Sequence, residues 1–219
     1  EMITGPLERA CFDDLDRAIG ALRDAGAQGT YDHPLSAYGL HLNIELDPLD
    51  EGRAIRVAAA YAFVEPWLRR VLEVDLLRRV TPFIDPYPRD YVEALGGLFE
   101  GGETPRLTAF LRLYAQWNAT RNRGLDMWPL LGALNAVAAE IALGAPVKNP
   151  RPAFHYRLPD SRLSQPGWSP RAEVRRWDAI ERIADAPERL ARARDACLDF
   201  LGWRIMRPGY EAEISELME

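Results

Sequence analysis

The sequence predicts an α+β fold in which a sheet of few strands is combined with many helices. Apolar residues recur at helical spacing along most of the chain, whereas only two segments, 39–46 and 153–158, alternate clearly with the period of a strand. Several predicted helices separate these segments, so the two strands can meet only as a non-local sheet. The 219 residues, 47% of them hydrophobic, are enough for one sizeable core.

The charge balance limits the classes of partner. A net charge of −6 argues against general binding to nucleic acid and against a polybasic contact with a membrane. No apolar run approaches the roughly 20 residues that span a bilayer, and no signal peptide precedes the first segment. Cys11 and Cys197 lie in helical patterns and are typical of small buried side chains. We therefore expect a cytoplasmic protein without a nucleic-acid or membrane partner.

The first part of the chain predicts two strands around one helix. Glu1–Thr4 is strand-like, and apolar residues at steps of three and four then predict an amphipathic helix over Arg9–Ala25, which ends at Gly26. Gly39–Leu46 has the cleanest alternation in the chain. One of its faces carries Leu40, Leu42, Ile44 and Leu46, and the other carries His41, Asn43 and Glu45.

The middle of the chain predicts helices joined by short connections. We expect them at 51–79, 91–99, 106–117 and 126–143, with a polar connector at 118–124. Pro66 predicts a break or kink in the first helix, because proline removes a helical hydrogen bond. The helix 126–143 is apolar on most sides, which is typical of a largely buried helix.

The end of the chain predicts one more strand, two helices and a tail. The strand at 153–158 is followed by helices at 171–184 and 187–202. These complete a single predicted domain, 1–204. The last residues, 205–219, are acidic, and we expect them to form a loose tail.

The strand 153–158 carries a cationic face and an apolar face. Strand side chains alternate, so His155 and Arg157 share one face with Ala153. The other face carries Phe154, Tyr156 and Leu158. The arginine fork suits phosphate or carboxylate, which makes an anionic ligand the leading candidate, although Arg157 could instead pair with an acidic residue across the sheet. Asp160 most simply anchors the following turn.

Two other polar groups are candidates for binding. His41, Asn43 and Glu45 could hold a divalent metal or orient a carboxylate substrate, or they could form an ordinary solvated sheet face. Arg121 and Arg123 of the connector could hold phosphate or remain solvated. The chain has no P-loop, no glycine-rich dinucleotide motif, and no HExxH, GxSxG or CxxC pattern. Their absence removes the most common nucleotide, zinc and serine-hydrolase interpretations.

Four stretches then stand out in order: EMITGPLE, AYGLHLNIEL, NATRNRGLDMWPLL and KNPRPAFHYRLPD. Together they resemble the amidoligase family, a branch of the carboxylate–amine ligase superfamily that includes glutamine synthetase and glutamate–cysteine ligase. The family's glutamate-led strand matches Glu1–Leu7, its GLH-type strand matches Gly39–Leu42, and its late strand ending in arginine matches Arg157. The resemblance covers about residues 1–200.

This resemblance implies a glutamine synthetase-like catalytic fold, in which an antiparallel sheet packs against many helices and its polar face binds ATP, Mg²⁺ and a carboxylate. ATP would phosphorylate the carboxylate, and an amine would attack the acyl phosphate to form an amide. The substrates would be small-molecule or peptide carboxylates and amines. The residues implied near the metal are Glu1, His41 and Asn43. The residues implied for catalysis are Arg157 and His155, and those for phosphate or ATP are Arg121, Arg123, Lys148 and Arg157.

The chain departs from the family pattern at two points. Asn43 stands where the family has a second histidine. The family's first strand, with paired glutamates, would lie upstream of Glu1, so we expect N-terminal strands to be missing from this chain. Two alternatives follow: a non-catalytic nucleotide- or ligand-binding module of the same fold, and a helical protein-interaction domain formed by 171–202.

Overall fold

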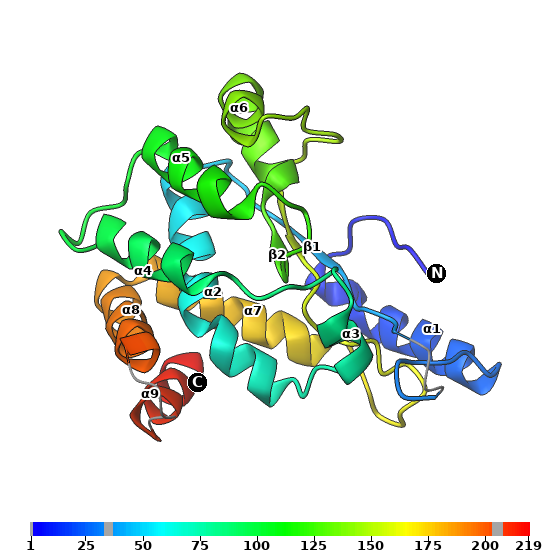
Figure 1. The fold of residues 1–219 in the computed structure, drawn as a ribbon. Helices are drawn as coiled ribbons and strands as arrows, with labels where there is room; N and C mark the ends of the chain where they lie inside the picture. Colours follow the sequence, from blue (N-terminus) through cyan, green and yellow to red (C-terminus); the bar gives the residue numbers. More distant parts are fainter. Residues whose placement is uncertain (1, 33–36, 203–207) are drawn as a thin grey trace.

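The computed structural model describes residues 2–32, 37–202 and 208–219. These residues are mostly helical and contain one three-stranded antiparallel sheet near the centre of the molecule (Figure 1). The predicted α+β class is therefore confirmed, whereas the glutamine synthetase-like fold stays a prediction. The helical elements are η1 (Arg9–Cys11), α1 (Phe12–Asp24), α2 (Glu51–Val71), α3 (Leu76–Val80), α4 (Arg89–Leu98), α5 (Leu107–Asn118), α6 (Trp128–Leu143), α7 (Arg171–Asp185), α8 (Pro187–Gly202) and α9 (Pro208–Met218).

The sheet has the strand order β1-β3-β2. The central strand β3 (Ala153–Tyr156) pairs antiparallel with β1 (Leu42–Glu45) and with β2 (Leu125–Asp126). β1 and β3 confirm the two predicted internal strands, although both are shorter than predicted. β2 was not predicted, because two residues are too few to show a period of two. The sequence instead assigned this segment to the end of a connector and the start of a helix.

One face of the sheet is a closed aromatic core. Phe154, Tyr156 and Leu158 are fully buried, as the alternation predicted. The ring of Trp177, from α7, lies 5.2 Å from the Phe154 ring and 5.4 Å from the Tyr156 ring, centroid to centroid. Tyr61, from α2, meets the Tyr156 ring edge-on at 5.8 Å. These contacts bury large apolar surfaces and fix the sheet against α2 and α7.

The helices form successive layers behind this aromatic face. α2 packs on α7 and α8, and α8 in turn packs on α4 and α9 (Figure 1). The predicted helices in the regions of α1, α4, α5, α7 and α8 are confirmed near their expected bounds. The opposite face of the sheet carries the polar side chains, and it is the face that matters for binding.

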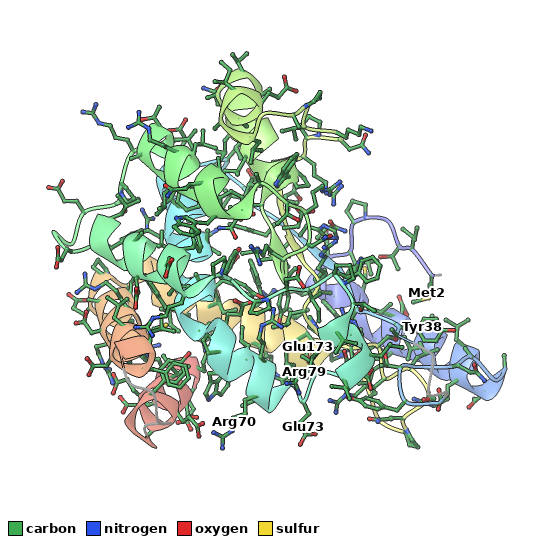
Figure 2. The ribbon with its side chains drawn as sticks, in the orientation of Figure 1. Met2, Tyr38, Arg70, Glu73, Arg79 and Glu173 are labelled. Carbon is green, nitrogen blue, oxygen red and sulfur yellow. The ribbon has the colours of Figure 1, made fainter. Side chains whose placement is uncertain are left out.

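The predicted helix over 51–79 is in fact two helices. α2 continues through Pro66 and ends at Val71, so a break at the proline is wrong. The helix holds there because buried side chains around the proline, including Phe63 and Leu68, stabilise it. The chain leaves the helix farther on, where Glu73 adopts a φ of +47° before α3 begins (Figure 2).

The prediction that helix 126–143 is largely buried is wrong for its second half. α6 is interrupted at Asn135, whose φ of −160° and ψ of 93° are not helical. Leu130 and Leu131, before this residue, are buried. Beyond it, the side chains of Val137 and Ile141 are 69% and 77% exposed. The second half buries one side only, through Ala139 and Leu143, so its apolar composition does not lead to burial on most sides.

The prediction of a loose tail is wrong for the residues that the structure describes. α9 is a helix that packs on α2, α7 and α8. Tyr210, Ile214 and Leu217 are buried, and the Tyr210 hydroxyl donates to the backbone oxygen of Phe63 at 2.9 Å. Three buried apolar side chains at steps of four and three give this acidic segment an apolar stripe.

The N-terminal strand prediction is also wrong where it can be examined. Met2–Thr4 is exposed and forms no strand, and Glu1 lies outside the described residues (Figure 2). Cys197 is buried as predicted, whereas Cys11 is only partly buried. A search of the described helices found none with the length and apolar character needed to cross a membrane.

Candidate functional site

The polar face of the sheet carries a row of three side chains that crosses all three strands. Asn43 is paired with His155, and His155 is paired with Asp126. Directly opposite residues in antiparallel strands point to the same side. Asn43 is exposed, whereas His155 is only 9% exposed and Asp126 is fully buried. The row therefore runs from solvent at β1 to a closed end at β2.

Asp126 is held as a carboxylate at the closed end of this row. Its Oδ2 accepts hydrogen bonds from Arg121 Nε at 2.9 Å and Nη2 at 2.7 Å, and lies 3.2 Å from His155 Nδ1. Its Oδ1 accepts from the backbone N–H of Trp128 at 3.2 Å. Burial by itself raises the pKa of this carboxyl. The hydrogen bonds from His155 and Arg121 outweigh burial, so the pKa of Asp126 lies below its ordinary value.

His41 lies beside His155 on the same face. The two rings meet edge-on with their centroids 5.2 Å apart. Although part of His41 is exposed, crowding of its ring by protein atoms lowers its pKa to about 4, and the nearby charges of His155, Arg157 and Arg78 add to this effect. His41 is therefore neutral at neutral pH.

Arg157 is fixed by backbone carbonyls rather than by an acidic side chain. Its Nε donates to the oxygen of Arg123 at 3.0 Å, and its Nη2 donates to the oxygens of Phe83, at 2.5 Å, and Arg121. Among the described residues no carboxylate forms an ion pair with it, and its Nη1 has no hydrogen-bond partner. Burial lowers the pKa of Arg157, but arginine stays charged at neutral pH. The result is a rigid cation with unused donors.

A buried ion pair contacts the backbone of Arg157 and helps to fix it. Arg78 Nη1 lies 2.6 Å from Asp160 Oδ1, and both side chains are almost fully buried. Arg78 also donates to the backbone oxygens of Leu158, at 2.9 Å, and Arg157, at 2.8 Å. Asp160 in turn accepts from the Tyr31 hydroxyl and from a backbone N–H of the α2–α3 connection. Asp160 thus anchors the turn, which agrees with the simpler of its two sequence interpretations.

The remaining predicted phosphate-binding cations lie away from Arg157 or already form hydrogen bonds within the protein. Arg123 is 8% exposed and donates to Asn118 Oδ1 and to two backbone oxygens, so it holds its own connector. Lys148 is exposed in the loop that enters β3, at the opposite end of the strand from Arg157. Only Arg121 of this group lies on the row, through Asp126, and its side chain is 45% exposed.

The described residues hold no cluster of metal-ligating side chains. They contain no group of three or more His, Cys, Asp or Glu side chains that could hold a metal ion. The Asn43 oxygen already accepts from Arg151 at 2.7 Å, and His41 faces cations. The oxygens of Asp126 are taken by protein donors. Glu1, the third predicted ligand, lies outside the described residues.

Sequence reasoning missed the roles of Asp126 and Arg78. Asp126 fitted the first turn of a helix, where a negative charge is common, and only the pairing of β2 with β3 brings it to His155. Arg78 fell within the predicted helix 51–79 without an assigned role, and its contacts with Leu158 and Asp160 bury it. Both residues depend on contacts between distant segments, which a single sequence does not show.

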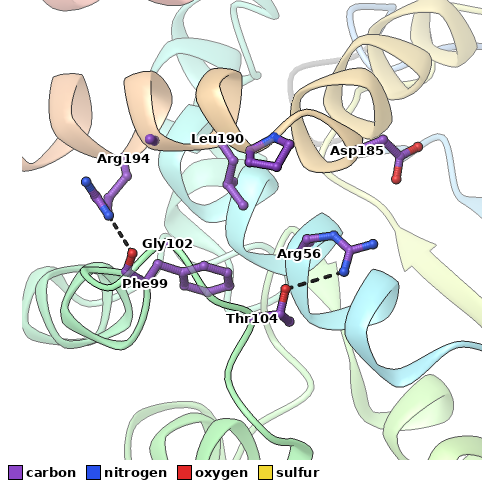
Figure 3. Close-up of a pocket in the computed structure, with 9 residues that line it drawn as sticks. Arg56, Phe99, Gly102, Thr104, Asp185, Leu190 and Arg194 are labelled. Atoms are coloured by element: carbon purple, nitrogen blue, oxygen red, sulfur yellow. Dashed lines mark hydrogen bonds between the residues drawn. The ribbon is translucent and has the colours of Figure 1, made fainter.

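A cavity of about 280 Å³ lies outside the sheet, between α2, the α4–α5 loop and the start of α8 (Figure 3). Two arginines stand on either side of it. Arg56 donates to the oxygen of Ala184 at 3.2 Å, and Arg194 donates to that of Phe99 at 2.6 Å. Both carbonyls belong to helix ends, so these arginines cap α7 and α4. The cavity has no evident link to the polar face.

Comparison with known families adds independent information. The model of a family described as "Putative amidoligase enzyme" matches residues 1–179. No curated protein matches the chain, and no solved structure does. The matched range includes β1, β2 and β3 and therefore the whole row Asn43–His155–Asp126, together with Arg157. The chain belongs to this amidoligase family.

Proposed function

We propose that this chain supplies the anion-binding sheet of an ATP-dependent carboxylate–amine ligase that works through an acyl phosphate. Membership of the amidoligase family supports a ligase. The observation that carries the finer proposal is Arg157, a guanidinium that is fixed on the open polar face and has no acidic partner among the described residues. A rigid cation of this kind suits a phosphoryl group.

Each polar residue has a defined part in this proposal. The free Nη1 of Arg157 donates to a phosphoryl oxygen, and Arg121, which is half exposed and paired with Asp126, offers its remaining N–H donors at the edge of the same face. His41 is neutral at neutral pH and adds no charge of its own to this face. Negative charge spreads over the transferring phosphoryl group, so preorganised cations stabilise it without reorganising.

The proposed reaction begins when a substrate carboxylate oxygen attacks the terminal phosphorus of ATP. The bond from that phosphorus to the bridging oxygen breaks, and ADP leaves with the electron pair. The resulting acyl phosphate reacts with an amine to give the amide and inorganic phosphate. The magnesium that such transfers normally use is bound through one or two carboxylates together with the substrate phosphates.

ATP turnover tests this proposal. The protein is incubated with ATP and magnesium, with amino acids or short peptides as carboxylates, and with ammonia as the amine. We expect ADP release that requires both added substrates. Arg157→Gln should lower turnover about 100- to 1,000-fold, because one preorganised donor to the developing charge is lost. Unchanged turnover in a folded Arg157→Gln variant would exclude this role for Arg157.

One observation favours a second function, a nucleotide-binding module without catalysis. The described residues contain no group of three or more His, Cys, Asp or Glu side chains that could hold a metal ion, and the amide of Asn43 is already bonded to Arg151. This alternative predicts that ATP binds and that no carboxylate or amine in the panel supports ADP release. Binding with turnover excludes it.

A further inference from the structure

We propose that Asp126 is a positioning residue that holds His155 as its Nδ1–H tautomer, so that Nε2 accepts a proton from the attacking amine. The assignment of the proton to an amine rests on the proposed function. The tautomer is a property of the protein alone and is measurable without any substrate.

The donors around Asp126 fix the direction of its bond to His155. Arg121 places two N–H groups on Oδ2, and Trp128 places its backbone N–H on Oδ1. The carboxylate is fully buried and its pKa lies below the ordinary value, so it carries no proton to donate. A carboxylate only accepts hydrogen bonds. At 3.2 Å, Nδ1 of His155 must therefore be the donor.

A donor at Nδ1 determines the state of Nε2. A neutral imidazole has one N–H and one lone pair, so the Nδ1–H tautomer places the lone pair on Nε2. Nε2 of His155 has no hydrogen-bond partner among the described residues, and it is not one of their fully buried, unpartnered side-chain atoms. Nε2 therefore keeps some contact with solvent, on the face of the sheet that His155 shares with Asn43.

Packing of the core does not require a carboxylate at position 126. β2 has only two residues, and its register sets Asp126 opposite the single histidine of β3. Burying a carboxylate is costly unless charged donors compensate it, and Arg121 supplies that compensation from five residues away in the sequence. The ion pair keeps Asp126 ionised while His155 remains the group that faces ligand.

The proton and electron balance of the proposed step is complete. The substrate ammonium gives one proton to Nε2, and His155 becomes the imidazolium, which Asp126 stabilises. The freed nitrogen lone pair forms the C–N bond as the C–O bond to phosphate breaks. The electron pair of that bond leaves with phosphate, which takes the second amine proton. Positioned proton transfer of this kind contributes about 100- to 10,000-fold in rate.

The direct test is ¹⁵N NMR of histidine-labelled protein at neutral pH. His155→Gln, by loss of its signals, identifies the ring. We expect an Nδ1–H tautomer in the natural protein and loss of this preference in Asp126→Asn, as the same substitution does in serine-protease triads. Asp126→Glu should restore part of it. An Nε2–H ring in the natural protein, or an unchanged Nδ1–H ring in folded Asp126→Asn, overturns the proposal.

A second measurement on the natural protein removes the need for the variant to fold. Diethyl pyrocarbonate acylates an unprotonated imidazole nitrogen, and peptide mass spectrometry separates His155 from His41. Carbethoxylation of His155 supports a free Nε2, whereas modification of His41 alone overturns it. If the tautomer is as expected but the ATP assay shows no ligation, the proposed function fails and the positioning of His155 stands.

Discussion

At the residue scale, charge on the polar face is arranged asymmetrically. Asp126 and Asp160 are each surrounded by protein donors, so these two buried carboxylates are already satisfied. Arg157 is fixed by carbonyls, and neutral acceptors do not cancel its charge. This contrast between satisfied anions and an unpaired cation is what makes an anionic ligand the expected occupant.

The buried pair beneath the face predicts a large stability effect. Arg78→Met leaves Asp160 buried without its cation, so we expect the free energy of unfolding to fall by about 3–5 kcal/mol. Urea unfolding measures this change. Arg79→Met is the matched control, because Arg79 is the next residue of α3 and is exposed, and it should change stability by no more than about 0.5 kcal/mol (Figure 2). Equal effects of the two variants would refute the support role of Arg78.

His41 predicts a pH dependence of stability. Its pKa in the fold is about 4, below the ordinary 6.5, so between these values the unfolded chain binds more protons. Stability should therefore fall as the pH is lowered from about 6.5 to 4, and should not depend on His41 above that window. His41→Gln, which keeps an uncharged side chain near His155, Arg157 and Arg78, should lose less stability. Unfolding curves at pH 7 and pH 5 for both proteins measure the difference, and identical losses would contradict this account.

At the element scale, the helices with a clear apolar stripe were predictable and those controlled by one distant contact were not. α1, α4, α5, α7 and α8 follow their periodicity. α6 shows the limit, because the interruption at Asn135 overrides an apolar composition that predicts burial. α9 shows the converse, since an acidic segment folds once Ile214 and its neighbours meet α2, α7 and α8.

Two isoleucines on these helices test this reading directly. Ile214 of α9 is fully buried, whereas Ile141 of α6 is 77% exposed. Ile214→Ala should lower the free energy of unfolding by about 2–5 kcal/mol, because it leaves a cavity. Ile141→Ala should stay within about 0.5 kcal/mol. Chemical denaturation of the two variants measures both changes, and a large loss in Ile141→Ala would mean that the side of α6 that carries Ile141 is packed.

At the scale of the whole molecule, strand alternation predicted which side chains lie on the polar face of the sheet. The pairing of distant strands determined which of these side chains contact one another. Alternation correctly placed His41 and Asn43 on one face of β1, and His155 on one face of β3, and their pairing in one sheet follows from the non-local strands. The contribution of Asp126 could not be predicted, because β2 exists only through its pairing with β3.

The same reasoning explains the corrected site assignments. Arg121 and Arg123 are two residues apart and looked equivalent in a polar connector. Arg121 reaches Asp126 at the closed end of the row, whereas Arg123 turns inward to Asn118 and lies over the ring of Tyr87. The difference arises from the parallel bridge of Arg123 with Asp85, a contact across distant segments. Composition alone does not distinguish such neighbours.

The most direct test of the central claim is calorimetric titration of ATP, with magnesium present, into the natural protein and Arg157→Gln. Binding through the polar face predicts a loss of about 1.5–3 kcal/mol in the variant, roughly 10- to 150-fold in Kd. Arg112→Gln, which removes an exposed arginine of α5, should bind ATP as the natural protein does. Equal ATP affinity in natural protein and folded Arg157→Gln, or no binding to either, would contradict the claim that this face is the phosphate site.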